Sequence, residues 1–273
     1  MGTKKYKPTS PGKRQRQTND YQDITTSEPQ KSLTKGGKNR AGRNNAGKLT
    51  VRSRGGGNKR KFRDIDFKRN KLNIEGTVVS VEYDPFRTAY ISLVNFIDGE
   101  KRYILTPNAV KVGDKIQSGE NAKIATGNTL PIVNIPVGTL IHNIEISKNT
   151  GAKLVRAAGT FAVITGRQEG YVSVKLPSGE VRLINNDCLV TIGKVSNSDH
   201  RNTVFGKAGS KRWIRRRSKV RGAVMNPCDH PHGGGEGKAP VGNASPRSKW
   251  GKKVFQKTRK KNKSYRLVLK KRK

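Results

Sequence analysis

The sequence has little acid, few cysteines and no long apolar run. Of its 273 residues, 19 are Asp or Glu and 58 are Lys or Arg, which gives a formal net charge of +39. The apolar runs are far shorter than the ~20 residues that a membrane-spanning helix needs, and no amphipathic or lipid-attachment segment stands out. We therefore expect a polyanion as partner, and we expect no membrane.

The two cysteines, Cys188 and Cys228, show neither metal-ligand spacing nor a disulfide framework. This usage is typical of an intracellular protein whose thiols are incidental. The N-terminus lacks the apolar stretch of a secretory signal. Its first acidic residue is Asp20, and a basic, acid-free start is also a property of mitochondrial presequences.

The basic excess is concentrated at the two ends of the chain. Residues 1–73 contain 21 basic and 5 acidic residues, residues 74–200 contain 13 and 12, and residues 201–273 contain 24 and 2. Such ends repel themselves and bury too little apolar surface to offset the entropy of ordering. A nucleic acid supplies counter-charge and releases condensed ions on binding, so this distribution predicts a nucleic-acid partner.

Residues 1–60 are poor in apolar residues and rich in Gly, Asn, Lys and Arg. Two interpretations fit this composition, a disordered linker and an extension that becomes ordered only on a nucleic acid. The basic C-terminal end favours the second interpretation. Residues 251–273 include 12 basic residues and no acid, and we expect a second cationic extension over 201–273.

The middle of the chain predicts short antiparallel strands. Alternation indicates strands over 74–83 and 88–97, and Asp98-Gly99 favours a hairpin before a return strand at 102–105. Residues 128–138, with prolines five apart, indicate a connector. Further strands are expected at 139–147, 153–156, 160–165, 170–176, 181–184 and 188–192. This spacing predicts two small barrels, over 61–127 and 128–200, that pack on each other because each is near the lower size limit for a core.

Residues 225–238 contain two of the four histidines, two prolines and four glycines, a density that excludes helix and strand. A basic run over 211–217 precedes this loop, after a short helix expected within 206–213. A loop poor in side chains, with cationic flanks, is suited to lie between phosphates. We predict nucleic-acid contacts for Lys211, Arg212, Arg215, Arg216, Arg217, His230, His232, Gly233, Gly234, Gly235 and Lys238.

Other chemistry fits this loop less well. Residues 233–238 end in Gly-Lys but lack the first glycine and the Ser or Thr of a phosphate-binding P-loop. Cys228, Asp229, His230 and His232 are too close together around a fixed proline to close on one metal ion. A hydrolase site at Asp229, His230 and His232 is a rival hypothesis, but no carboxylate cluster near a histidine supports acid–base catalysis. We predict no metal, no cofactor and no catalytic residue.

Two questions stay open on composition. Trp213 and Trp250 lie beside basic residues and are equally suited to stack on bases and to anchor the C-terminal segment on the second barrel. The charge by itself also fits a general nucleic-acid-compacting protein. The hypothesis of a compacting protein does not explain a glycine loop with paired histidines.

The loop resembles the signature of a known family. Met225-Asn226-Pro227 and Asp229-His230-Pro231-His232, with the glycines that follow, are similar to the universal large-subunit ribosomal protein L two family. Other motifs resemble that family in the same order, among them Lys7-Pro8-Thr9-Ser10-Pro11-Gly12, Asp66-Phe67-Lys68-Arg69, Glu82-Tyr83-Asp84-Pro85 and Gly127-Asn128-Thr129-Leu130-Pro131. The resemblance covers essentially the whole chain and is bacterial in texture. Its first motif matches where mature family members begin, so we expect no presequence.

The resemblance implies an all-β fold, an OB-type barrel followed by an SH3-like barrel, with long basic N- and C-terminal extensions laid into ribosomal RNA. The implied partners are large-subunit rRNA, neighbouring ribosomal proteins and, across the subunit interface, small-subunit rRNA. The chain would act as a monomer within the cytoplasmic ribosome, supporting subunit association and the organisation of the peptidyl-transferase region.

By the same resemblance, Arg87 and Arg156 are associated with RNA binding, and Lys68 and Arg69 belong to a shared motif. His230 has been discussed in the family as catalytic. The chemistry of the ribosome is carried out by RNA, so we interpret His230 as a structural or positioning contact and expect no enzymatic activity. Two positions depart from the family pattern, Cys228 where Val is common and Asn58 where His is common.

Overall fold

The computed structural model describes residues 2–254 and 263–272. Residues 2–38, 59–207 and 264–272 form a first compact unit, and residues 39–58, 208–254 and 263 form a second. This grouping cuts across the linear boundaries expected near residues 60 and 200. Part of the expected C-terminal extension, residues 255–262, lies outside the described residues.

The first barrel is built on a four-stranded antiparallel sheet in the order β7-β6-β5-β8. Its strands are β5 Glu75–Glu82, β6 Ile91–Phe96, β7 Lys101–Leu105 and β8 Lys115–Gln117. Alternate side chains face two apolar clusters, one around Val78 and Ile104 and the other around Ile91 and Tyr103. The expected hairpin is present, with Gly99 at φ 82 donating its N–H to Phe96 O at 2.9 Å. Local alternation therefore predicted this barrel correctly.

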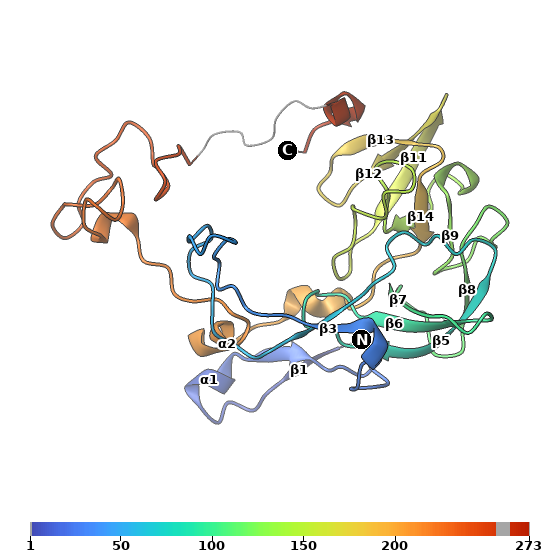
Figure 1. Cartoon of the computed structure of the whole chain (residues 1–273), viewed down its shortest axis with the longest axis horizontal. Helices are drawn as coiled ribbons and strands as arrows, with labels where there is room; N and C mark the ends of the chain where they lie inside the picture. Colours follow the sequence, from blue (N-terminus) through green and yellow to red (C-terminus); the bar gives the residue numbers. More distant parts are fainter. Residues whose placement is uncertain (1, 255–262, 273) are drawn as a thin grey trace. The chain divides into compact units, whose positions relative to one another are not determined.

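The second barrel is a seven-stranded antiparallel sheet in the order β15-β13-β12-β11-β10-β14-β9 (Figure 1). The strands are β9 Thr129–Pro131, β10 Leu140–His142, β11 Ala162–Gln168, β12 Tyr171–Lys175, β13 Val181–Asn185, β14 Leu189–Ile192 and β15 Val268–Lys270. Inward-facing residues of these strands and of η2 (Ile132–Asn134) form one core, including Ile132, Ile141, Ile164, Val172 and Val190, each at most 1 % exposed. Strand β15, from the C-terminal end of the chain, adds an edge strand to this sheet.

Three expected elements differ from the structure. The connector at 128–138 contains strand β9 and the 3-10 helix η2. Pro131 is compatible with β9 because this strand lies at the edge of the sheet, where a missing N–H leaves no neighbour unpaired. The strand expected at 153–156 is only an isolated bridge between Ile144 and Leu154. The strand expected at 139–147 is shortened to Leu140–His142.

The two barrels pack on each other, as their small size requires. Val195, which lies just after β14 of the second barrel, is fully buried in the core cluster of the first barrel. Asn197 Nδ2 donates to Thr88 O at 2.7 Å, and Tyr90 N donates to Ser196 Oγ at 3.2 Å. These bonds join the segment that leaves β14 to the segment that enters β6.

Residues 2–38 are hydrogen-bonded to the protein itself. Strands β1 (Thr3–Lys5) and β2 (Gln17–Asn19) pair around the short helix α1 (Pro11–Arg14). After η1 (Lys31–Leu33), strand β3 (Thr34–Gly36) pairs with β4 (Lys61–Arg63). Gln30 N donates to the buried Tyr103 hydroxyl at 2.7 Å, and that hydroxyl donates to Glu82 Oε2 at 2.8 Å. Part of the expected N-terminal extension is therefore held to the barrel unit by hydrogen bonds of its own backbone.

The C-terminal end also returns to the first unit. The apolar residues near 265–269 form the end of η5 (Lys263–Leu267) and strand β15, which pairs with β13 through Val181↔Lys270 and Arg182↔Val268. Ahead of it lie η3 (Ser198–Asn202) in the first unit, and α2 (Ala208–Trp213) and η4 (Gly222–Val224) in the second. Helix α2 falls where a short helix was expected.

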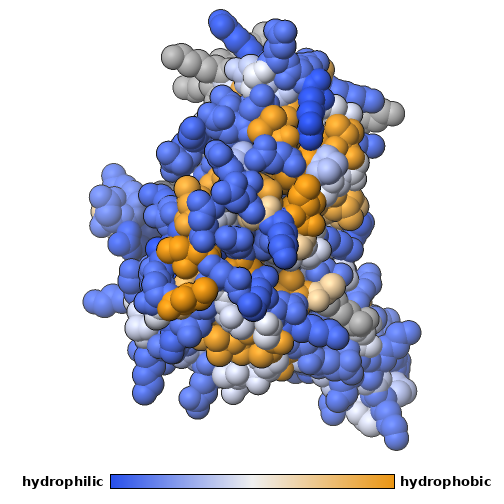
Figure 2. Space-filling view, turned by 90° about the vertical axis from the view of Figure 1, so that its right-hand side faces the viewer, coloured by the Kyte–Doolittle hydropathy of each residue, from blue (hydrophilic) through white to orange (hydrophobic). Residues whose placement is uncertain are grey.

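The surface is mainly hydrophilic. Figure 2 shows charged and polar side chains over most of one face, with apolar side chains in separate patches between them. None of the helices in the described part of the chain has both the length and the apolar character needed to cross a membrane.

Candidate nucleic-acid interface

The basic run after α2 is held against an earlier basic segment within the second unit. Arg217 N donates to Ser53 O at 3.1 Å and Gly55 N donates to Arg215 O at 3.3 Å, with an antiparallel bridge between Arg54 and Arg216. Gly57 is required where the two segments meet, because a Cβ there would overlap Trp213 O. The two basic segments therefore form one surface, defined here as the arginine ribbon: residues 52–58 and 211–217.

The side chains of the ribbon are not equivalent. Lys211, Arg212, Arg216 and Arg217 are exposed, as a phosphate contact requires. Arg215 is half-buried at φ 68, and its Nη2 donates to Asn58 O at 2.8 Å. Arg215 therefore joins the two segments of the ribbon and presents less of its guanidinium to a ligand than its neighbours do.

The two tryptophans of the chain lie in this second unit and are about half exposed, Trp213 at 53% and Trp250 at 52%. An exposed indole is suited to stack on a base. An anchoring contact of either ring on the second barrel stays a prediction.

The loop at 225–238 closes on its own backbone. His232 N donates to His230 Nδ1 at 3.1 Å, and the two rings lie 4.7 Å apart. Gly233 N donates to His230 O at 2.9 Å, and Arg247 N donates to His232 Nε2 at 2.8 Å. Because His230 Nδ1 and His232 Nε2 accept these hydrogen bonds, both imidazole rings are tied to the backbone of the second unit.

His230 is 5% exposed. Burial, followed by the positive charges of His232, Arg52 and Lys249, lowers the pKa of His230 below its ordinary value. Its side chain thus shapes the loop from inside, while Gly234, Gly235 and Lys238 are exposed and His232 and Gly233 are half-buried. Sequence reasoning placed His230 in the right loop but did not foresee its burial.

Gly222 is the residue that makes room for the His230 ring. A Cβ at position 222 would overlap Cε1 and Nδ1 of that buried ring, so the ring would have to move. Gly222→Ala is therefore expected to destabilise the second unit by about 1 to 3 kcal/mol and to raise the pKa of His230 toward its ordinary value as the ring is displaced.

NMR titration of His230 and tryptophan fluorescence during urea unfolding measure the two effects. Gly209→Ala is the matched control, since Gly209 lies in α2 and a Cβ there meets nothing within 4 Å. An unchanged pKa of His230 in Gly222→Ala would contradict this account of the loop.

Within the first unit, the fold brings Arg87 and Arg156 to the same aromatic ring. The guanidinium carbon of Arg156 lies 4.6 Å from the centroid of Phe67, and that of Arg87 lies 5.5 Å from it. Lys68, which follows Phe67 in the sequence, is exposed. Four residues from three separate segments of sequence therefore meet at one place.

Arg69 is buried, and its side chain forms hydrogen bonds inside the protein. It adopts φ 54 and is 5% exposed, with Nε donating to Thr129 Oγ1 at 3.1 Å and Nη2 to Gly127 O at 3.0 Å. Burial lowers the pKa of Arg69 to about 10. Its side chain ties the first barrel to the start of the second, so it is not available to a phosphate and we leave it out of the interface.

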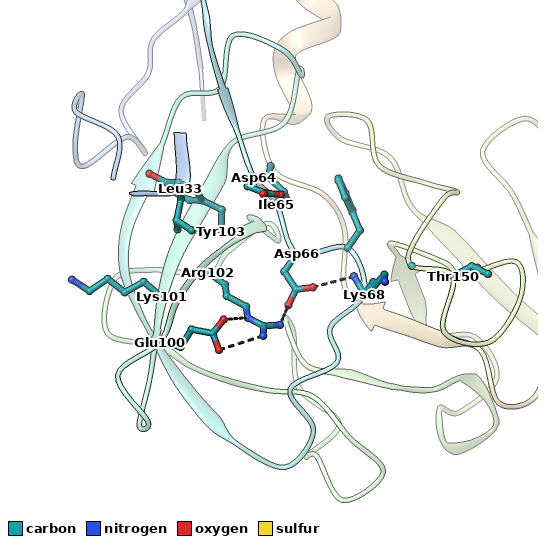
Figure 3. A pocket seen from close by; sticks show the side chains of 12 residues that line it. Leu33, Asp64, Ile65, Asp66, Lys68, Glu100, Lys101, Arg102, Tyr103 and Thr150 are labelled. Atoms are coloured by element: carbon teal, nitrogen blue, oxygen red, sulfur yellow. Dashed lines mark hydrogen bonds and ion pairs between the residues drawn. The ribbon is translucent and has the colours of Figure 1, made fainter. Parts of the chain in front are cut away.

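A cavity of about 500 Å³ lies beside Lys68 at the junction of the barrels. Figure 3 shows Asp66 and Glu100 pointing toward Arg102, whose Nη1 donates to Asp66 Oδ2 at 2.9 Å and whose Nε donates to Glu100 Oε1 at 2.7 Å. The carboxylates near this cavity thus already have cationic partners. Sequence reasoning did not anticipate the cavity, because its lining comes from segments between residues 33 and 151.

Residues considered as metal ligands do not converge. Within the described ranges, no three His, Cys, Asp or Glu side chains come together in an arrangement that suits a metal ion. Cys228 and Asp229 are exposed, while His230 is directed into the loop. Cys188 is a buried free thiol in the core of the second barrel.

Two packed β barrels, exposed arginines on a surface of their own and a glycine loop between cationic segments are typical of an RNA-binding protein. Two family models match the chain: residues 30–118 match Ribosomal Proteins L2, RNA binding N-terminal domain, and residues 125–251 match Ribosomal Proteins L2, C-terminal domain. These matches cover most of the sequence. The chain belongs to the ribosomal protein L2 family.

Family membership confirms several expectations. The chain is a structural constituent of the large subunit of the cytoplasmic ribosome and binds rRNA. Its all-β architecture, an OB-type barrel followed by an SH3-like barrel, agrees with the mostly β structure described above. The family is one of structural proteins.

Proposed function

We propose that the chain holds large-subunit rRNA by two kinds of contact. The barrel unit presents Lys68, Arg87 and Arg156, while the arginine ribbon and the loop at 225–238 present exposed cations and bare backbone. The observation that carries this proposal is the contrast between the nearly neutral residues 74–200 and the exposed arginines of the ribbon. Phosphate contacts of this kind fix position and orientation along RNA.

The proposed contact residues are at least partly exposed or are glycines. They are Lys68, Arg87, Arg156, Lys211, Arg212, Arg216, Arg217, His232, Gly233, Gly234, Gly235 and Lys238. Arg215 supports these residues by joining the two segments of the ribbon. His230 supports them by filling the interior of the loop.

The loop suits a crowded RNA environment because its backbone is already hydrogen-bonded internally and its run of three glycines carries no side chains. We place it toward the peptidyl-transferase region of the subunit, where it organises RNA and performs no turnover of its own. The chain acts there as a monomer, contacts neighbouring ribosomal proteins and, through small-subunit rRNA, supports subunit association.

The salt dependence of RNA binding tests the ribbon. Replacing Lys211, Arg212, Arg216 and Arg217 together by Gln is expected to reduce the slope of log affinity against log salt by about 3, since each lost phosphate contact removes about 0.7 to 0.9. The measurement is binding of the full chain to a large-subunit rRNA transcript over a range of salt concentrations.

The matched control replaces four exposed lysines of the barrels, Lys101, Lys111, Lys123 and Lys175, by Gln. It removes the same charge and is expected to change the slope by much less. Equal changes in the two variants would mean that total charge alone determines binding, which contradicts the proposed interface.

A further inference from the structure

Phe67 is the centre of a group that the two barrels build together. Arg87 comes from the turn after β5 in the first barrel, and Arg156 comes from the loop before β11 in the second. Both guanidinium carbons lie within 5.5 Å of the Phe67 ring centroid. A cation at this distance from an aromatic face is attracted by the ring quadrupole. The Phe67 ring therefore attracts two cations, one from each barrel.

Each guanidinium is also fixed by a hydrogen bond on one side. Arg87 Nε donates to Asp84 Oδ2 at 2.6 Å, and the Asp84 side chain is fully buried. Arg156 Nη1 donates to Ala152 O at 3.2 Å, while Ala152 N donates to Phe67 O at 2.8 Å. These bonds leave both Nη groups of Arg87, and Nε and Nη2 of Arg156, for a ligand.

The backbone beside Arg156 shows that its position is determined by the surrounding structure. Val155 adopts φ 53, a left-handed conformation that a β-branched residue rarely takes. Its carbonyl accepts a hydrogen bond from Asn143 N at 3.0 Å, and its side chain packs against the core of the second barrel. Strain of this kind persists only where the surroundings hold it in place.

Two like charges on one ring favour an anion between them. Partial burial, and after it the positive charge of Arg87, lowers the pKa of Arg156. Arg156 is exposed and the Arg87 side chain is 18% exposed, so an anion has access to the pair. Asp84 neutralises one of the two charges, and an RNA phosphate would neutralise the other while accepting hydrogen bonds from both guanidinium groups.

We propose that Phe67 is a positioning residue that makes Arg87 and Arg156 one composite site for a single RNA phosphate. This inference rests on the proposed RNA contact of the two arginines and adds to it that they act together, through a ring that itself touches no RNA. The site spans the two barrels, so binding there depends on both of them.

A double-mutant cycle on the affinity for a large-subunit rRNA transcript tests the proposal. Arg87→Ala and Arg156→Ala are each expected to weaken binding about tenfold, the contribution of a hydrogen bond to a charged group. Because they share one phosphate, the double variant is expected to bind about as well as either single variant, and not about a hundredfold more weakly than wild type, as independent sites would require.

Variants of Phe67 test its role separately. Phe67→Leu keeps apolar volume but removes the aromatic face, so it is expected to weaken binding about as much as one arginine substitution, about tenfold, and to abolish the coupling between the arginines. Phe67→Tyr keeps the face and is expected to retain both affinity and coupling. Phe161→Leu is the matched control, since the ring of Phe161 carries only Lys194, at 5.9 Å.

The possible outcomes separate this inference from the proposed function. If the two arginine substitutions each weaken binding and their effects multiply, the shared site is overturned while the RNA contact stands. Wild-type affinity in Phe67→Leu overturns the positioning role in the same way. If neither arginine variant changes the affinity, the RNA contact itself fails. The cycle in the wild-type background needs no Phe67 variant, so a folding defect in Phe67→Leu cannot obscure the result.

Discussion

Arg69→Met is expected to lower the free energy of unfolding of the barrel unit by about 2 kcal/mol, because it removes two buried hydrogen bonds. Arg69 Nη2 donates to Gly127 O at 3.0 Å and its Nε donates to Thr129 Oγ1 at 3.1 Å. Methionine preserves much of the aliphatic volume, so the loss reflects mainly the hydrogen bonds. The same substitution is expected to leave the salt dependence of RNA binding unchanged.

Lys68→Met is the matched variant, and it is expected to change the salt dependence of RNA binding but not the stability. Lys68 is exposed, so its loss should hardly change stability, while the slope of log affinity against log salt should fall by about 0.7 to 0.9. Far-UV circular dichroism in urea measures the first effect for both variants, and RNA binding at several salt concentrations measures the second. A stability loss in Lys68→Met with none in Arg69→Met would contradict the assignment of the two side chains.

Acidification from about pH 7 to about pH 5 is expected to reduce the stability of the barrel unit by about 2 kcal/mol through His142 alone. His142 is fully buried, its Nδ1 lies 2.9 Å from Gly193 O, and burial lowers its pKa to about 4. Its unfolded pKa is about 6.5. Between these values the unfolded chain binds more protons, so stability is full above about pH 6.5 and falls as the pH decreases toward about 4.

Urea unfolding followed by far-UV circular dichroism at several pH values measures this effect. Circular dichroism is needed because both tryptophans lie in the second unit and do not report on the barrels. His142→Gln is expected to lose most of the acid destabilisation. His200→Gln is the control: His200 is only half-buried, and although burial lowers its pKa as well, most of the dependence should persist without it. An equal loss in both variants would contradict the role of His142.

The parts of the fold that sequence could predict are those that depend on local pattern. Strand β5 and the hairpin at Asp98-Gly99 follow from alternation and from a turn pair, which are properties of neighbouring residues. Strand β9 was missed because Pro131 is tolerated only at a sheet edge, and edge position is set by strands that lie far away in sequence. Strand β15 was missed for the same reason, since its partner β13 lies more than eighty residues earlier.

The candidate site shows the same limit. Lys68 and Arg69 are adjacent and chemically similar, yet one faces solvent and the other is buried, because the left-handed backbone at Arg69 turns its side chain inward. The two histidines of the loop could be located from composition, but the burial of His230 depends on the space left at Gly222. The group around Phe67 could not be predicted at all, since only the packing of two barrels brings its arginines together.

Protection of large-subunit rRNA by the purified full chain, at moderate salt and with excess competitor RNA, distinguishes recognition by the fold from binding by charge alone. We expect protection of a few discrete segments that survives the competitor, because fixed barrels and a preformed loop recognise RNA of a particular shape. Uniform protection that disappears as salt rises would contradict it. That result would mean that the net charge of +39 binds RNA without using the fold.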